Sequence, residues 1–271
     1  MTVTDTVRAE FTFFAPPLDG AHAYSIVEWV PDSGIPRTNS VQEKHKVQVD
    51  NLRGKEHTVT LDTAGFQFFR RAATHTAFVD DEAVKREYYP ESIDFVKDIT
   101  GASRVVVFDH TIRRRNPAED GFLPSNRQPA TIVHVDQTPA AAVARVHRHL
   151  PAEDVPALLA RRFQIINLWR PIAHAALDWP LALCDFHSVD PARDLAPVTL
   201  KYPDRDGETF GVKHSSDQKW TYLRGMEPEE FVLIKCYDSK EGWHNSLRIP
   251  HSPTRAPRKT PCSESPSSFA C

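Results

Sequence analysis

Length, composition and charge exclude several classes of protein before any motif is considered. The chain has 271 residues with 33 basic and 36 acidic side chains, a formal net charge of −3 and 4 cysteines. A near-neutral chain without a basic stripe is a poor nucleic-acid binder, and no apolar run reaches the roughly 18–20 residues that cross a membrane. The cysteine spacing fits neither a disulfide framework nor a zinc motif. We therefore expect a cytoplasmic protein with a small-molecule partner, no nucleic acid and no membrane; the sequence leaves the oligomeric state open.

Two parts of the first hundred residues have clear periodicity. Residues 10–14, 46–52 and 57–61 carry β-branched or aromatic side chains at alternate positions, which predicts strands, the last two joined as a hairpin. Residues 80–99 have helical periodicity and begin with acidic side chains, where the helix dipole favours negative charge. Pro90 should divide this segment into two helices.

The middle of the chain alternates strand and helix patterns. The apolar run at residues 104–109 predicts a central strand, and residues 131–136 predict another. Thr138 should cap the alanine-rich helix 140–150, with Pro139 at its first position. Further elements are a helix at 152–162 and short strands at 163–171, 181–185, 198–202, 208–213, 219–223 and 231–237. Many short strands beside a helical insert favour a mostly β fold with flanking helices over a doubly wound parallel sheet.

The last 29 residues differ in composition from the rest of the chain. Residues 243–271 hold five prolines, six serines and one acidic residue, without apolar periodicity. Such a segment buries too little apolar surface to offset its ordering entropy, which predicts disorder. We therefore expect a single domain at residues 1–242 followed by a divergent tail.

The strongest local motif is His134-Val135-Asp136. Residues two apart on a strand share a face, so the imidazole and the carboxylate should converge on one point. This is two-thirds of the two-histidine, one-carboxylate arrangement that holds ferrous iron and leaves positions open for a co-substrate and oxygen. The triplet also occurs by chance, so a surface or hydrogen-bonded pair is the alternative.

Three polar side chains are candidates for catalysis or for binding an acidic group. Arg113 opens a run of three arginines that could clamp a carboxylate or phosphate, although such runs are more often solvated loops. Asn167 and Arg170 are three apart, so they cannot both face inward on a regular strand. A bend before Pro171 would aim Arg170 at the site; the alternative is a structural salt bridge.

Lys235 is a further candidate because it lies within the apolar run LIKCY at 233–237. A buried, unpaired lysine is costly, so this side chain either faces solvent or pairs with a carboxylate such as Asp238 or a bound acid. Four aromatic side chains either line an apolar substrate pocket or pack in the core, namely Trp169, Trp179, Trp220 and Tyr222.

Longer strings carry a resemblance to a known family. TIVHVDQT at 131–138, QIINLWRP at 164–171, WPLALCD at 179–185 and LIKCYDSK at 233–240 resemble the fungal aspergillic acid cluster hydroxylase/desaturase and gibberellin desaturase family. The resemblance implies a double-stranded β-helix (jelly-roll) fold, Fe(II) and 2-oxoglutarate as cofactors, and a setting in secondary-metabolite biosynthesis. By the same resemblance His134 and Asp136 match the iron ligands. From the residues themselves, Arg113, Arg170 and Lys235 are all candidate carboxylate partners, and Arg170 is the candidate for binding 2-oxoglutarate.

The resemblance ends near residue 243. Family members continue into a Thr-Pro-His-Thr-Ala-Phe-like segment with the distal iron histidine and then a strand with an arginine suited to 2-oxoglutarate; neither occurs here. Codons compatible with the tail, read one base earlier, spell a close match to that ending. We therefore hypothesise a shifted reading frame, with the lost histidine encoded across Arg248 and Ile249 and the lost arginine across Ser263 and Glu264. His251 is the candidate replacement ligand, although its neighbouring prolines argue against a regular strand.

The sequence thus predicts an oxidoreductase that hydroxylates or desaturates a small-molecule intermediate of fungal secondary metabolism. Two alternatives use the same scaffold. One is a non-oxidative cyclase of the hetero-Diels–Alderase type, since some relatives close rings without net oxidation. The other is an inactive remnant that lacks the C-terminal metal ligand.

Overall fold

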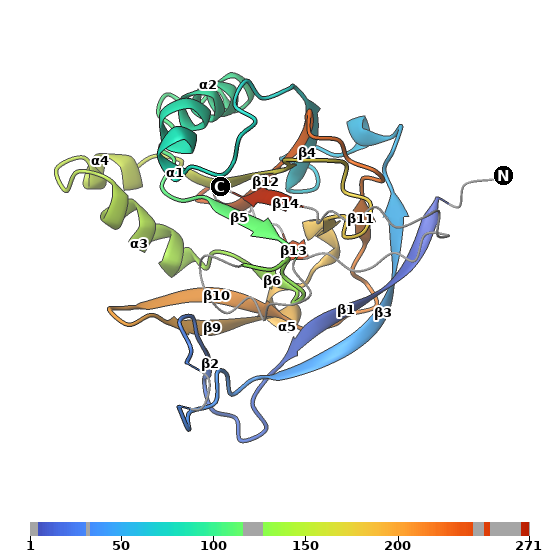
Figure 1. Ribbon diagram of the computed structural model, residues 1–271. Helices are drawn as coiled ribbons and strands as arrows, with labels where there is room; N and C mark the ends of the chain where they lie inside the picture. The colour runs from blue at the N-terminus through green and yellow to red at the C-terminus, as the bar shows by residue number, and fades with distance from the viewer. Residues whose placement is uncertain (1–4, 31–32, 116–126, 241–246, 250–266, 271) are drawn as a thin grey trace.

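Two β-sheets and a group of helices make up the chain. The computed structural model describes residues 5–30, 33–115, 127–240, 247–249 and 267–270 (Figure 1). The larger sheet has nine strands, in the order β1 (Thr6–Ala15), β3 (Val41–Asn51), β11 (Trp220–Tyr222), β8 (Ala182–Cys184), β13 (Leu247–Ile249), β6 (His134–Val135), β10 (Asp206–Val212), β9 (Leu195–Lys201) and β2 (Ala23–Ile26). The smaller sheet has the order β4 (Phe66–Arg70), β12 (Glu230–Asp238), β7 (Gln164–Pro171), β14 (Ser267–Ala270) and β5 (Thr111–Arg114). The expected mostly β, jelly-roll fold is confirmed.

The first helical segment lies against the smaller sheet. It runs through α1 (Asp81–Ala83), the π-helical turn η2 (Val84–Tyr88) and α2 (Tyr89–Thr100). Asp80 caps it by accepting a hydrogen bond from the Glu82 amide at 3.0 Å. The helical segment is therefore continuous through Pro90, which lies in the first turn of α2. The predicted division into two helices is replaced by the π-helical turn that precedes this proline.

The second helical group lies beside the first in Figure 1 and follows the strand β6. Its first member, α3 (Pro139–His149), begins as predicted, because the Thr138 hydroxyl accepts a hydrogen bond from the Ala141 amide at 3.1 Å. Its second member, α4 (Val155–Leu159), is shorter than the predicted helix 152–162. The remaining short helical elements are η1 (Glu56–Thr58), η4 (Phe186–Ser188) and α5 (Pro191–Asp194).

The predicted hairpin of residues 46–52 and 57–61 is wrong. The strand β3 instead pairs antiparallel with β1 over its whole length, with Phe11 opposite His45. Residues 56–58 form the 3₁₀ helix η1, which follows a turn at Gly54 with φ of 83°. The ten-residue partner strand β1 offers far more ladder hydrogen bonds than a short local hairpin, so the long-range pairing prevails.

The predicted central strand at residues 104–109 is also wrong. This segment has no regular secondary structure, and Val106 is 41% exposed. Phe108 stacks on His149 of α3 at a ring-centroid distance of 5.0 Å, and Arg145 of the same helix lies over the Phe108 ring at 5.0 Å. Phe108 therefore packs against α3, while the segment around it forms no strand.

The remaining predicted strands are present with small shifts of their ends. β6, β7, β8, β9, β10, β11 and β12 all lie within or next to their predicted ranges. β13 and β14 fall within 243–271, where disorder is expected; their backbones pair with strands of the larger and the smaller sheet respectively. The other residues of that range lie outside the described part of the chain.

The smaller sheet is buried on both faces. On β12, Phe231, Val232, Leu233 and Ile234 are all fully buried. Phe231 packs against Phe95 of α2 at 4.4 Å between ring centroids, so one face of the sheet meets the helix. The other face meets the larger sheet within one hydrophobic cluster. Burying each such side chain contributes about 1.5–3 kcal/mol, which makes this sheet the centre of the fold.

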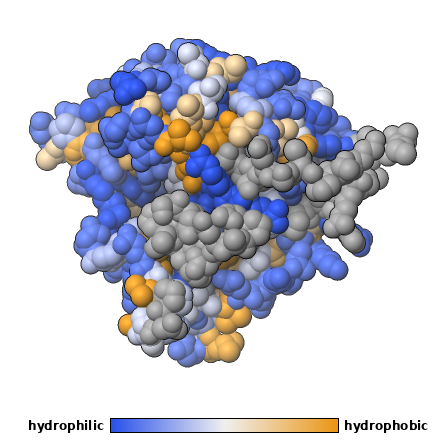
Figure 2. Space-filling view, viewed as in Figure 1, coloured by the Kyte–Doolittle hydropathy of each residue, from blue (hydrophilic) through white to orange (hydrophobic). Residues whose placement is uncertain are grey.

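The surface carries mostly polar side chains. The face drawn in Figure 2 is largely hydrophilic, with apolar groups gathered mainly below the first helical segment. Among the described residues, none of the helices is both long enough and apolar enough to span a bilayer.

Candidate metal centre

His134 and Asp136 converge where the short strand β6 ends. The Nε2 atom of His134 lies 3.1 Å from Oδ1 of Asp136, and the two side chains are 27% and 24% exposed. Val133 and Val135, which alternate with them, are fully buried. The convergence predicted from the His-x-Asp spacing is therefore confirmed, while the role of the pair as metal ligands stays a prediction.

The surroundings of the His134 ring favour a cation beside it. Its Nδ1 lies 2.8 Å from the Ile132 carbonyl, which can only accept, so Nδ1 carries a proton. Its Nε2 faces the Asp136 carboxylate, a second acceptor. A backbone carbonyl that fixes the tautomer in this way is the usual support of a metal-binding histidine.

Asp136 is held from the opposite sheet. The Asn167 side-chain amide on β7 donates to Oδ2 of Asp136 at 2.6 Å. The Cys236 thiol on β12 lies 3.6 Å from the same oxygen. Asn167 is 9% exposed and Cys236 is fully buried. Sequence reasoning selected Asn167 but not Cys236, which has no motif of its own and becomes visible only through the pairing of β7 with β12.

Arg170 lies on the other face of β7 from Asn167. Trp169 is opposite Val232 and Asn167 is opposite Ile234 in the antiparallel pairing with β12. Because directly opposed residues share a face and neighbours alternate, Arg170 faces away from the site.

The surroundings of Arg170 confirm this placement. Its guanidinium lies over the rings of Tyr88 and Phe231 at 5.5 and 5.1 Å, beneath the helical segment, and is 5% exposed. The expected bend before Pro171 does not bring it to His134. The assignment of Arg170 to the 2-oxoglutarate carboxylate is therefore corrected.

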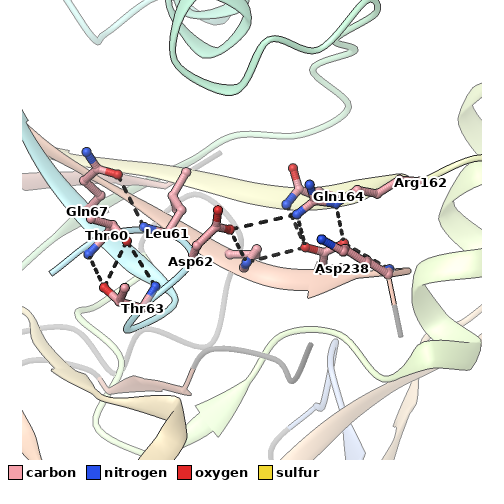
Figure 3. A network of polar contacts seen from close by, with 10 residues as sticks. Thr60, Leu61, Asp62, Thr63, Gln67, Arg162, Gln164 and Asp238 are labelled. Atoms are coloured by element: carbon pink, nitrogen blue, oxygen red, sulfur yellow. Dashed lines mark hydrogen bonds and ion pairs between the residues drawn. The ribbon is translucent and has the colours of Figure 1, made fainter. Parts of the chain in front are cut away.

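Lys235 shares that outer face and belongs to a buried ion-pair network. Its ammonium lies 3.2 Å from Asp62 and 3.4 Å from Asp238, and the side chain has no exposed area. Arg162 donates to both Asp238 oxygens, at 3.0 and 2.6 Å, and Gln164 adds a third hydrogen bond. Figure 3 shows Asp62, Arg162, Gln164 and Asp238 lying close together in this network. The predicted pairing with Asp238 is confirmed, and the geometry makes Lys235 structural, which corrects its assignment as a catalytic residue.

The network also sets the ionisation of Asp238. Burial alone would raise the pKa of this carboxyl. Hydrogen bonds from Arg162, the Lys240 amide and Gln164, with the Arg162 charge, outweigh burial and hold the pKa below its usual value of 3.8. Asp238 is therefore a carboxylate at neutral pH.

Arg113 lies on the same face as Asn167, at the far side of the smaller sheet. It is opposite Ser268 on β14, which is opposite Pro171 on β7. Its Nη1 donates to the Gln128 carbonyl at 2.9 Å. The structure therefore keeps Arg113 as a candidate partner for an acidic group.

Arg127 is a second candidate on this face, which sequence reasoning missed. Its Nη1 donates to the Thr111 hydroxyl at 3.1 Å. Thr111 is opposite Ala270 on β14, and Ala270 is opposite Trp169 on β7. Thr111 therefore lies two residues nearer to Asn167 along the sheet than Arg113 does. No sequence signal marks Arg127; only the strand pairing brings it to this face.

The third metal ligand is not assigned. His251 lies outside the described residues. Within the described ranges, no set of three or more His, Cys, Asp or Glu side chains is grouped as a metal centre. The backbone of Arg248 on β13 lies directly opposite His134.

The four aromatic candidates separate into core and surface positions. Trp220 and Tyr222 are buried in a second hydrophobic cluster, together with side chains of β1 and β3. Trp169 is buried on the inner face of β7. Trp179 is half-buried with the Arg115 guanidinium over its ring at 5.5 Å. Trp169 and Trp179 therefore remain the candidates for contacting a substrate.

Comparison with known proteins establishes the family. The family model described as "Oxidoreductase/YMDC permease-like domain" matches residues 11–269. The chain therefore belongs to this family, and the names of its relatives place it among the oxidoreductases. The expected resemblance to fungal hydroxylase/desaturases is confirmed by the relatives that follow.

Two curated relatives match nearly the whole chain. Hydroxylase/desaturase CTB9 of Cercospora beticola is 33% identical over 262 residues, covering 90% of this chain and 79% of the relative. Fe(II)/2-oxoglutarate-dependent dioxygenase nvfI of Aspergillus novofumigatus is 34% identical over 256 residues, covering 90% of both. A solved structure of the iron and alpha-ketoglutarate-dependent endoperoxidase NvfI superposes with a TM-score of 0.86 at 31% identity, covering 99% of this chain and 97% of that one.

Proposed function

We propose that this chain is an Fe(II)- and 2-oxoglutarate-dependent oxygenase of the hydroxylase/desaturase type, acting on a small-molecule intermediate of fungal secondary metabolism. The observation that carries the proposal is the 3.1 Å approach of His134 Nε2 to Asp136 Oδ1, with the ring tautomer fixed by a backbone carbonyl. The names of the relatives supply the cofactors and the class of reaction. One nitrogen and one oxygen donor on a single face suit a ferrous ion.

The residues of the inner face have distinct roles in this proposal. His134 and Asp136 hold the metal. Arg127 or Arg113 binds the far carboxylate of 2-oxoglutarate, in place of Arg170. When bound, iron with 2-oxoglutarate supplies the oxidising power that removes a substrate hydrogen. Trp169 and Trp179 contribute apolar surface that orients a substrate next to the metal.

We further propose that residues 243–271 are a frame-shifted version of the family ending, attached to a domain at 1–242. The backbone of Arg248 lies opposite His134. In the shifted reading frame, the codon of the lost histidine would begin within the codon of Arg248. A histidine at this position would be one strand away from the first ligand. Sequencing the transcript tests this: an intact message that encodes Trp243 onward as written contradicts it.

The experiment for the oxygenase proposal measures succinate formation from 2-oxoglutarate. Three chains are compared under air with Fe(II): the wild type, His134→Ala, and a chain with the reading frame restored from residue 243. We expect succinate from the restored chain, much less from the wild type, and none from His134→Ala. Succinate that is independent of His134 would contradict the assigned centre.

Two alternatives are tested with the same chains, the first in a separate anaerobic reaction. Anaerobic conversion of a substrate without iron or 2-oxoglutarate would indicate the non-oxidative cyclase. Inactivity of the wild type with activity of the restored chain would indicate that this chain is a remnant. We also propose a cytoplasmic location, because Cys184 is a buried free thiol, as in reducing compartments; imaging of a tagged chain tests it.

A further inference from the structure

We infer that Asn167 and Cys236 are positioning residues that hold Asp136 as a one-oxygen metal ligand. This inference rests on the proposed function, because it concerns the metal that His134 and Asp136 would bind. Neither residue binds the metal itself. They act on the outer carboxylate oxygen, Oδ2, and so determine which oxygen is presented beside His134.

The Asn167 contact is short and built into a strand. Its Nδ2 lies 2.6 Å from Asp136 Oδ2, and the side chain is 9% exposed. Hydrogen bonds to a carboxylate are about twice as strong as neutral ones and are worth more when buried. The backbone of Asn167 is fixed opposite Ile234, which is fully buried. The amide therefore restrains the carboxylate from a rigid part of the smaller sheet.

Cys236 reaches the same oxygen because β12 has an irregularity at this residue. The register of β12 against β7 shifts between Lys235 and Tyr237, which leaves Cys236 as the extra residue of a bulge. Such bulges redirect a side chain and are common beside active sites. The Cys236 thiol lies 3.6 Å from Asp136 Oδ2 and is fully buried.

The consequence concerns coordination geometry. Oδ2 is engaged by the Asn167 amide and approached by the thiol, whereas Oδ1 faces His134 Nε2. A carboxylate held in this way would offer a metal Oδ1, the oxygen beside His134, and would keep Oδ2 on its protein partners. One-oxygen binding leaves more coordination positions open, which a centre that must also take a co-substrate and oxygen requires.

Binding of Co²⁺ to the purified full-length chain, without oxygen turnover, tests the inference. We expect Asn167→Leu to weaken Co²⁺ binding by about 10–100-fold, the usual effect of losing a supporting partner. Cys236→Ala should weaken it by about 2–10-fold, the range for one hydrogen bond. Cys236→Ser, which keeps a donor, should restore most of the affinity.

Cys184→Ala is the matched control. Cys184 is also fully buried, but its thiol contacts Ser188 and the Asp185 carbonyl, not Asp136. It should leave Co²⁺ affinity unchanged. Thermal melting without metal shows whether any variant has lost its fold, and visible absorption of bound Co²⁺ should weaken in Asn167→Leu as Asp136 turns to bind by both oxygens.

The outcomes separate this inference from the proposed function. Tight Co²⁺ binding by the wild type with equal binding by folded Asn167→Leu would overturn the inference and leave the metal centre intact. An intense thiolate-to-cobalt absorption band, lost in Cys236→Ala, would overturn it by making Cys236 a ligand. Absence of Co²⁺ binding by both the wild type and the chain with the reading frame restored would overturn the metal centre itself, and the inference with it; binding by the restored chain alone moves the same comparison of variants into that chain.

Discussion

The side chains of Asn167 and Asp136 join the two sheets through a hydrogen bond of 2.6 Å. Asn167 belongs to β7 of the smaller sheet, and Asp136 follows β6 of the larger one. The geometry of the candidate metal pair therefore depends on how the sheets pack, and not only on the spacing within the His-x-Asp motif. Changes in the hydrophobic core between the sheets should reach the site through this bond.

Lys235 should matter for stability and not for metal binding. We expect Lys235→Met to lower the free energy of unfolding by about 3 kcal/mol, as when one partner of a buried ion pair is removed. The Lys235 ammonium has no exposed area and lies 3.4 Å from Asp238. Urea unfolding measures the effect, with the exposed Lys219→Met as a control expected to stay within about 0.5 kcal/mol. Weaker Co²⁺ binding by folded Lys235→Met would show that its structural assignment is incomplete.

Asp238 should make stability depend on pH in acid. Its pKa in the folded chain lies below 3.8, mainly because hydrogen bonds and the Arg162 charge outweigh burial. A carboxyl with a depressed pKa adds stability that is fully present above its unfolded pKa and is lost as pH falls through the folded one.

The measurement is urea unfolding of the wild type and Asp238→Asn between neutral pH and pH 3. We expect a constant difference in the free energy of unfolding at neutral pH, and a shrinking difference as the pH falls below 3.8. A difference that grows in acid would mean that Asp238 is protonated in the folded chain.

Arg127 and Arg170 should differ in their effect on 2-oxoglutarate. We expect Arg127→Gln to raise the KM for 2-oxoglutarate by about 10–100-fold, the effect of losing a charge-assisted hydrogen bond. Arg170→Met keeps an unbranched chain between Tyr88 and Phe231 and should leave this KM unchanged. The assay uses the chain with the frame restored. The reverse pattern would reinstate Arg170 at the co-substrate.

Gly211 should tolerate no side chain. A Cβ atom at this position would lie 2.5 Å from the Phe14 ring, and Gly211 is directly opposite His134. We expect Gly211→Ala to lower the free energy of unfolding by about 1–3 kcal/mol through overpacking. Thermal melting measures it, with Gly207→Ala as the milder control, since its nearest neighbour is the Tyr202 ring at 3.1 Å. The double variant with Phe14→Ala should recover part of the loss; equal effects of the two glycines would contradict the steric explanation.

The candidate site could be predicted only in part. The His134 and Asp136 pair followed from the period of two along a strand, because that period is local. The placement of Arg170 and Lys235 on the outer face did not follow, because the inner face of β7 is defined only by its pairing with β12. The spacing of three residues between Asn167 and Arg170 indicated only that both could not face inward. Cys236 and Arg127 carried no sequence signal. A bulge in β12 turns Cys236 toward Asp136, and the pairing of β5 with β14 places Thr111, the hydrogen-bond partner of Arg127, on the inner face.

By itself the sequence determined the class of fold, most of the strands from β6 to β12, the capped start of α3 and the convergence of one histidine with one carboxylate. These features depend on contacts within a few residues. The tertiary structure alone decided that β3 pairs with β1, that Phe108 packs against α3 outside any strand, and which polar groups support Asp136. Those outcomes depend on competition between distant segments for the same hydrogen bonds and the same buried surface, which no local pattern records.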